Sequence, residues 1–322
     1  MKPESGKRES FLAAGSLSFS AWPHRLAVVA ACATFPLLFI GGLVTSKGAG
    51  LAVPDWPTTF GYNMFLYPWA KMVGGIFYEH SHRLVGSFVG LLTIFLAVAF
   101  WFKEERQWLR WLGLVALIMV IVQGVLGGLR VVLLQQTLAV VHAAFAQAFF
   151  AFIASLALLT SKEWRHESTE RPIEDGGRLR RLCIITTAMI YLQIVFGAVL
   201  RHTGARLDAH LLFAALVFVH VGLVVVQATR FHFDRFQLAR PAFFLGALLL
   251  LQLLLGIFSY LGKFTTMLRL PGETLVFVTT THLAVGALML MVSLILTLRT
   301  YRLSLSESSL PGQRILREQP SL

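Results

Sequence analysis

Four histidines, His82, His142, His210 and His282, lie in or at the edge of apolar stretches that are long enough to cross a membrane. A histidine inside a membrane span is uncommon and indicates a functional site. Each is expected in the first two turns of an even-numbered spanning helix, so all four are predicted at one depth near the outer face. Two neutral imidazoles on opposite sides of one iron are a usual way to hold haem, and helix bundles build such sites between facing helices. The spacing therefore predicts two haem sites, each between two histidines.

The residue four positions after each of these histidines is small, which would leave room for a porphyrin beside its ligand. These residues are Gly86, Ala146, Ala214 and Gly286. Three alternatives stay open. Each histidine could simply join helices as a satisfied polar group. A proton-relay transporter could also use intramembrane His and Glu, although that does not explain the doubled pattern. Zinc would require clustered ligands, which the sequence does not show.

A carboxylate accompanies only the first histidine. Glu79 precedes His82 by three residues, so both share a helix face if the helix begins early enough, whereas His80 would point elsewhere. The matching position in the second half is Leu207, and Asp208 is out of register. A carboxylate there suits acid–base chemistry, although it could also be a helix-start residue favoured by the dipole. We expect chemistry in the first half and electron conduction in the second.

Basic side chains are expected at the outer helix ends, where haem propionates would emerge. Arginine forms forked, charge-assisted hydrogen bonds to carboxylates. Arginines at helix ends also extend to the membrane–water interface without any functional role. The candidates are Arg83, Arg130, Arg201 and His202.

The elements that position these residues follow from composition. Of 322 residues, 56% are apolar and 14% are charged, which is too apolar for a soluble domain of this length. Backbone groups in lipid must be satisfied within each segment, so an all-α, polytopic membrane protein is predicted. Its eight spans are expected at residues 26–46, 83–102, 111–130, 137–160, 182–200, 208–228, 241–261 and 275–298.

The distribution of the net charge of +12 indicates an orientation in the membrane rather than a nucleic-acid-binding surface. Most Lys and Arg residues fall on the side of both termini, which predicts cytoplasmic termini. Cys32 and Cys183 lie in expected spans, so no loop disulfide or cysteine-rich metal site is predicted. The polar leader 1–24 does not resemble a transit peptide, and the first apolar run is too long for a cleaved signal. We expect the plasma membrane of a bacterium.

A charged linker divides the chain into two halves of four spans. The halves share a Gln-x-x-x-Gly element, Gln123/Gly127 and Gln252/Gly256, although Gly-rich spans also look alike by composition alone. An even number of spans gives both halves one orientation, related by a pseudo-twofold axis along the membrane normal. The expected parts are an N-terminal segment 1–25, a first bundle 26–160, a linker 161–181, a second bundle 182–298 and a tail 299–322.

Only the first half has a long external segment, between its first two spans. Its aromatic residues suit either an interfacial belt or a lid over a flat, apolar substrate. They are Trp56, Trp69, Tyr62, Tyr67 and Tyr78.

Several blocks together resemble the haem A synthase family, and the resemblance covers all eight spans. They are GGLVTSKGAGLAVPDWP, the E-x-S-H-R block that begins at Glu79, AVVHAAFAQ, the RHTGA turn and TTTHLAVGAL. The resemblance implies a membrane oxidoreductase that converts the C8 methyl of haem O to a formyl group by successive hydroxylations. It implies His82 and His142 as ligands of the substrate haem, His210 and His282 as ligands of a haem b cofactor, and Glu79 as the catalytic residue.

Two departures from the family pattern affect these expectations. The external loop lacks the cysteine pair of one family branch, and the block from Asp208 to Leu212 lacks the arginine often found after the ligand. Two alternatives remain: a di-haem b electron carrier, and a non-catalytic haem carrier in oxidase assembly. The expected partners are haem O, an unidentified electron acceptor, the lipid bilayer and, as a further candidate, the haem O synthase.

Overall fold

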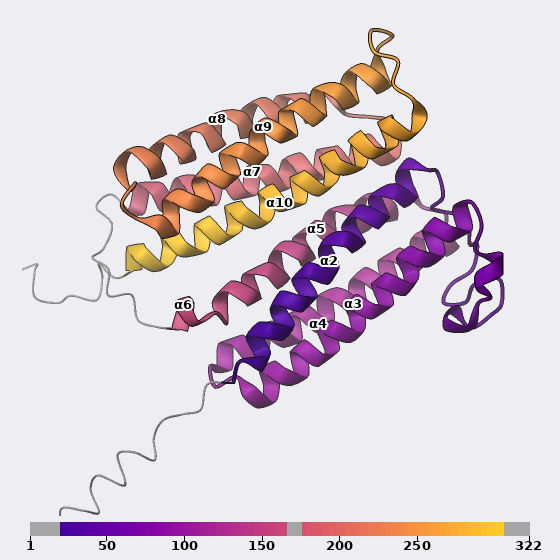
Figure 1. Cartoon of the computed structure of the whole chain (residues 1–322), viewed down its shortest axis with the longest axis horizontal. Helices are drawn as coiled ribbons and strands as arrows, with labels where there is room; N and C mark the ends of the chain where they lie inside the picture. Colours follow the sequence, from indigo (N-terminus) through magenta and orange to yellow (C-terminus); the bar gives the residue numbers. More distant parts are fainter. Residues whose placement is uncertain (1–19, 166–175, 306–322) are drawn as a thin grey trace, which may run out of the picture.

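The computed structural model describes residues 20–165 and 176–305. Eight of its helices are long and apolar enough to cross a membrane, and no strand forms among the described residues, so the all-α, multi-pass prediction is confirmed. The spanning helices are α2 (Trp22–Ser46), α3 (Gly75–Lys103), α4 (Gln107–Val132), α5 (Gln136–Leu159), α7 (Gly176–Thr203), α8 (Leu207–Phe231), α9 (Phe236–Phe264) and α10 (Gly272–Leu305) (Figure 1). Within the described ranges there are also three short helices, η1 (Met64–Leu66), η2 (Trp69–Lys71) and α6 (Lys162–Arg165).

Most helices extend beyond the expected spans, because helices continue through the polar interface after the apolar run ends. This extension overturns one expectation. Since α10 begins at Gly272, His282 lies in its third turn rather than in its first two. Helix α3 begins at Gly75, early enough to place Glu79 and His82 on one helix.

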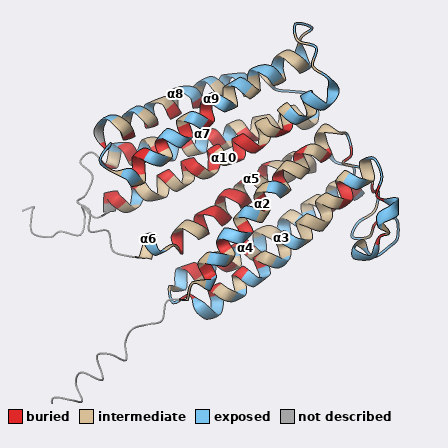
Figure 2. Cartoon of the chain, viewed as in Figure 1, coloured by how far each residue is buried: buried red, intermediate tan, exposed pale blue. Residues whose placement is uncertain are grey.

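The eight spanning helices pack as two groups of four. Helices α2 to α5 contact one another around one ring and helices α7 to α10 around another, while α5 and α10 lie where the two groups meet (Figure 1). Half of the spanning window of α10 is buried, against 17% for α4, so α10 is a central helix and α4 a peripheral one. Buried residues accordingly follow the inner faces, and exposed apolar residues follow the outer ones (Figure 2).

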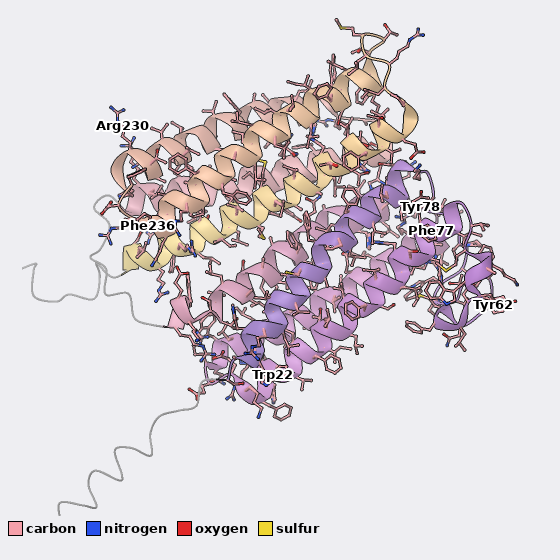
Figure 3. All side chains as sticks on the ribbon, viewed as in Figure 1. Trp22, Tyr62, Phe77, Tyr78, Arg230 and Phe236 are labelled. Atoms are coloured by element: carbon pink, nitrogen blue, oxygen red, sulfur yellow. The ribbon has the colours of Figure 1, made fainter. Side chains whose placement is uncertain are left out.

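Aromatic side chains mark both ends of the bundle. Trp22 and Phe236 lie at one end, and Tyr62 and Phe77 lie at the other (Figure 3). All four are exposed. Such aromatic rings favour the headgroup level of a bilayer, where an apolar body and a polar edge are both accommodated.

A buried carboxylate at the end of the first helix group forms an ion pair with the segment that follows α5. Glu104, at the end of α3, accepts hydrogen bonds from Arg106 at 2.9 Å and from Arg165 at 2.5 Å. Burial acts to raise the pKa of Glu104, but the two guanidinium groups outweigh it and hold that pKa below its ordinary value.

Candidate functional site

The structure brings the four predicted histidines together as two pairs. His82 on α3 faces His142 on α5 with ring centroids 6.5 Å apart, and His210 on α8 faces His282 on α10 at 6.3 Å. Each pair lies within one group of four helices. The ring planes are steeply crossed, at 83° and 74°. The sequence pattern predicted the four histidines at a similar depth, and the pairs that the structure forms are those that the family resemblance implied.

Each imidazole packs against a glycine on a neighbouring helix. A Cβ atom at that glycine would lie 3.0 to 3.2 Å from the ring, too close for most side chains. The pairs are Gly41 with His82, Gly127 with His142, Gly197 with His210, and Gly256 with His282. These glycines differ from the small residues expected four positions after each histidine. Of those, Gly86 and Ala146 line a cavity, whereas a Cβ atom at Gly286 would lie 3.3 Å from the Gln252 amide nitrogen.

This geometry fits a metal held between two imidazoles. A metal-bound imidazole nitrogen lies about 2 Å from the metal, so the centroids of two opposed rings are expected roughly 6 Å apart. No group of three or more His, Cys, Asp or Glu residues could hold a metal ion within the described ranges. A porphyrin supplies four nitrogen ligands of its own, so two protein ligands suffice for haem iron. Both histidine pairs therefore fit haem.

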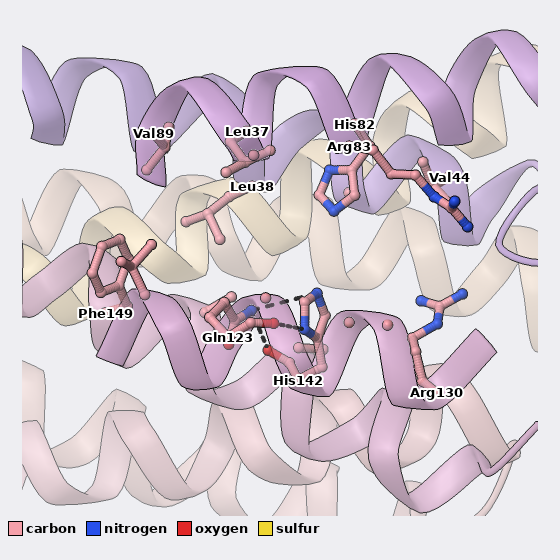
Figure 4. Close-up of a pocket in the computed structure, with 18 of the residues that line it drawn as sticks. Leu37, Leu38, Val44, His82, Arg83, Val89, Gln123, Arg130, His142 and Phe149 are labelled. Atoms are coloured by element: carbon pink, nitrogen blue, oxygen red, sulfur yellow. Dashed lines mark hydrogen bonds between the residues drawn. The ribbon is translucent and has the colours of Figure 1, made fainter. Parts of the chain in front are cut away.

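A cavity of about 500 Å³ adjoins the first pair. His82 and His142 both line it, and its walls come from α2, α3, α4 and α5 (Figure 4). Towards the middle of the bundle its lining is apolar, with Leu37, Leu38 and Phe149. The cavity is large enough for a small-molecule site and combines an apolar body with a few polar groups.

Glu79 forms part of this cavity wall and is buried. Its carboxylate accepts a hydrogen bond from the Val53 backbone N–H at 2.8 Å and pairs with Arg83 at 2.9 Å. Arg83 in turn donates to the carbonyl oxygens of Asp55 at 2.7 Å and Thr58 at 3.1 Å. The predicted propionate ligand Arg83 is thus already engaged with Glu79 and the external loop.

The other three predicted basic residues also line the cavity. Arg130 donates to the Gly50 carbonyl at 2.6 Å, and Arg201 donates to the Gly42 carbonyl at 2.8 Å. Arg201 and His202 belong to α7, so the second half contributes to the cavity of the first. The sequence placed them at an outer helix end but carried no signal for which half they would serve.

The external loop supplies one wall of the cavity. Trp56 lines it and packs so closely on α4 that a Cβ atom at Gly128 would lie 2.2 Å from the indole. Trp56 is also 40% exposed, whereas Trp69 and Tyr62 are exposed without lining the cavity, as an interfacial belt requires. Tyr67 is buried within the loop. The two interpretations of the loop aromatics therefore apply to different residues.

His80 serves the loop rather than the cavity. Its ring is buried, lies 3.1 Å from the Thr59 hydroxyl through Nδ1, and packs on Tyr67 with centroids 5.1 Å apart. This direction agrees with the expectation that His80 points away from His82.

The second pair lacks a matching carboxylate. Asp208 lies in the first turn of α8, but it is exposed and forms an ion pair with Arg206 at 3.6 Å. Three glutamines accompany the histidines: the Nε2 atoms of Gln123, Gln193 and Gln252 lie 3.4 to 3.5 Å from a histidine Nε2. Sequence reasoning had recognised two of these and missed Gln193, although Gln193 and Gly197 repeat the same Gln-x-x-x-Gly spacing.

Known proteins match this chain over the first half and part of the second. A family model described as "Cytochrome oxidase assembly protein" matches residues 24–210. A haem A synthase of Shouchella clausii is 31% identical over 186 residues, which is 57% of this chain and 60% of the relative. A haem A synthase of Alkalihalophilus pseudofirmus is 28% identical over 56% of this chain and 60% of the relative.

A third haem A synthase, from Geobacillus kaustophilus, is 25% identical over 258 residues, which is 70% of this chain and 78% of the relative. The chain thus spans about 60% of the length of the first two relatives that it matches. Because the family model covers more than half of the chain, this protein belongs to the family of cytochrome oxidase assembly proteins.

Proposed function

We propose that this protein is a haem A synthase, which oxidises the C8 methyl group of haem O to a formyl group by successive hydroxylations. One observation carries the proposal. The cavity beside the His82–His142 pair holds a buried carboxylate, Glu79, whereas no carboxylate adjoins the His210–His282 pair among the described residues. The names of the relatives agree with this activity.

The two histidine pairs take different roles in this proposal. His82 and His142 hold the substrate, haem O, in the cavity. His210 and His282 would hold a haem b cofactor, which would supply electron transfer between the substrate site and an unidentified electron acceptor. Bis-histidine ligation suits electron transfer because the iron keeps its ligands in both oxidation states.

Glu79 is the proposed catalytic residue. It acts as an acid–base group or stabilises positive charge that develops on the substrate. Its partners Val53 N–H and Arg83 fix the carboxylate at the cavity wall. A charge-assisted pair of this kind stays ordered in an apolar surrounding, so the carboxylate keeps one position relative to the substrate.

The remaining basic residues bind the propionates of the substrate. Arg130, Arg201 and His202 line the same cavity. Arg201 retains a buried Nε atom without a hydrogen-bond partner among the described residues. Arg83 contributes less directly, because its guanidinium already holds Glu79 and the loop.

The proposed setting is the bacterial plasma membrane with both termini in the cytoplasm. The distribution of basic residues supports this orientation. It places both histidine pairs towards the outer face. The haem O synthase is the proposed supplier of substrate.

Haem extraction tests the function. Cells that make haem O are given this protein, and their haems are separated by chromatography. Haem A or its hydroxylated precursor is expected. Unchanged haem O with two bound haems would instead identify a di-haem electron carrier, and unchanged haem O with one loosely bound haem would identify a haem carrier.

A further inference from the structure

One polar side chain in the inner part of the cavity has an unused hydrogen-bond acceptor. Gln147 lines the cavity from α5 and is buried, with 5% of its surface exposed. Its Oε1 atom has no hydrogen-bond partner among the described residues. A buried amide without a partner is costly, and the cost disappears when a ligand supplies the missing hydrogen bond. Gln147 is therefore placed to bind a polar group of the molecule that fills the cavity.

Other polar side chains that line the inner part of the cavity are already engaged. Thr34 and Ser87 each donate to a backbone carbonyl oxygen of their own helix, at 2.7 and 3.0 Å. Oε1 of Gln123 is also unpartnered, but the Gln123 amide nitrogen donates to the His142 carbonyl at 3.0 Å, which holds this side chain beside the ligand. Oε1 of Gln147 forms no hydrogen bond to a neighbouring helix, so helix joining does not explain this glutamine.

Gln147 lies on the inner side of the histidine pair, away from the basic residues. It follows His142 by five residues on α5, which places it about 7.5 Å further along the helix axis. Arg130 lines the outer end of the cavity from the last turn of α4. Figure 4 shows Arg130 and Phe149 on opposite sides of the two histidines, and Gln147 precedes Phe149 by two residues. A flat ligand centred between the histidines therefore directs one edge towards Arg130 and the opposite edge towards Gln147.

Haem O, the substrate in the proposed function, carries a polar group at the matching edge. It differs from protohaem in one substituent, because a hydroxyethylfarnesyl group replaces the vinyl group at C2. The two propionates leave the porphyrin at one edge, and the C2 substituent leaves it at the opposite edge. With the propionates at Arg130 and Arg201, the C2 hydroxyl group points inward, towards Gln147. The farnesyl chain then continues along the apolar lining of Leu37 and Leu38.

We propose that Gln147 recognises the hydroxyl group of the hydroxyethylfarnesyl substituent and so makes the cavity selective for haem O. The inference rests on the proposed function and deepens it. The hydroxyl group donates a hydrogen bond to Oε1 of Gln147, and no covalent bond changes. A site that hydrogen-bonds a substrate hydroxyl group discriminates against the analogue that lacks it, because the buried polar group of the site is then left unpaired.

The competing explanation is that Gln147 only fills space beside the farnesyl chain. A side chain that only fills space contributes equally to the binding of any haem with the same chain. A hydrogen bond contributes only when the hydroxyl group is present. Removing the amide and removing the hydroxyl group, separately and together, therefore isolates the interaction between them.

The test measures binding without turnover. Full-length protein in detergent is titrated at the Soret band with haem O and with deoxyhaem O, in which hydrogen replaces the hydroxyl group. Gln147→Met removes the amide but keeps an unbranched side chain of similar length. It should weaken haem O binding roughly 10- to 100-fold and leave deoxyhaem O binding unchanged. Equal changes for the two ligands, or no change, would overturn the proposal.

Two features of the design control for indirect effects. Gln227→Met makes the same replacement on α8, outside the cavity lining, and should leave the binding of both ligands unchanged. Binding at the second histidine pair is common to all the titrations, so it cancels in the comparison.

The unmutated protein provides a measurement that needs no variant to fold. Deoxyhaem O should bind to it roughly 10- to 100-fold more weakly than haem O. Equal affinities would contradict the inference even if the protein makes haem A. A protein that discriminates between the two ligands but makes no haem A would contradict only the proposed function.

Discussion

The two halves of the molecule repeat one scaffold and differ in what surrounds it. Both hold a histidine pair with ring centroids just over 6 Å apart, and each ring packs on a glycine. Among the described residues, the first half adds the buried carboxylate Glu79 at a cavity, whereas the second has the exposed Asp208 at the start of α8. The two halves therefore share the arrangement of paired histidines and glycines, and the described residues differ in the cavity and carboxylate that accompany the first pair.

The external loop explains why only one half can bury a carboxylate. A buried charge requires hydrogen-bonding partners, since its loss of hydration is otherwise too costly. The loop supplies the Val53 N–H directly to Glu79 and orients Arg83 through its carbonyl groups. In the second half α7 ends at Thr203 and α8 begins at Leu207, so the connection is too short to do the same.

The largest expected effect comes from removing the carboxylate that distinguishes the halves. Glu79→Gln should keep both haems bound but lower formyl production by at least about 100-fold, because acid–base or charge stabilisation is lost. Bound haem is measured by the Soret spectrum, and product by chromatography. Asp208→Asn, the control in the other half, should retain activity. Undiminished synthesis in Glu79→Gln would remove Glu79 from the mechanism.

The second effect tests whether the two pairs hold different haems. His210→Ala removes one proposed iron ligand in the second half. It should abolish most of the low-spin haem b signal and leave substrate haem bound in the first half. Difference spectra with extraction of each haem measure both. Equal loss of the two haems would contradict the division of labour.

A smaller effect is expected where the loop closes the cavity. Gly128→Ala introduces a Cβ that would meet Trp56 at 2.2 Å, so the indole must move, at a cost of about 1–3 kcal/mol. Haem O affinity should fall, as measured by titration of the Soret band. Gly222→Ala, on α8 and outside the cavity lining, also has open space around it and should leave affinity unchanged. Equal affinities in the two variants would show that Trp56 does not cover the substrate.

The smallest effect concerns the fold of the loop itself. Partial burial acts to raise the pKa of Asp55, but hydrogen bonds from Gly61 N–H, Thr58 and Phe60 N–H outweigh it and lower that pKa below the ordinary value. The stabilisation is therefore complete above the ordinary carboxyl pKa and is lost as the pH falls through the lowered one. Asp55→Asn should loosen the loop at neutral pH by about 1 kcal/mol.

Acrylamide quenching of tryptophan fluorescence measures this loosening. The emission of Trp56 is the part of the tryptophan fluorescence that disappears in Trp56→Phe. At pH 7, acrylamide should quench this emission more strongly in Asp55→Asn than in the parent protein. The two proteins should converge in strong acid, where Asp55 is protonated. Identical quenching at pH 7 would show that Asp55 does not order the loop.

Much of the fold could be predicted because lipid leaves few alternatives. Long apolar runs in a bilayer must be helices, so composition and run length alone predict the eight spans. Helix ends were less predictable, since an apolar run ends before its helix does. This is why His282 lies deeper in α10 than expected.

Within the site, the sequence indicated residue types but not all of their neighbours. The four histidines, Glu79 and the basic residues are unusual in or beside membrane spans, so they could be identified from the sequence as candidate site residues. The glycines behind the rings were not predicted, because they belong to neighbouring helices and contacts between helices leave no fixed spacing in the chain. Gln193 repeats a spacing seen elsewhere and could have been found.

The sequence by itself determined that this protein is helical, spans a membrane and carries four intramembrane histidines, because each of these follows from local composition. Only the tertiary structure decided that Arg201 and His202 of the second half line the cavity of the first, and that a glycine of a neighbouring helix lies against each of the four histidine rings. The physical reason is the same for both. These relationships depend on how helices distant in the chain pack together, and packing in a bilayer is set by close contacts between helices.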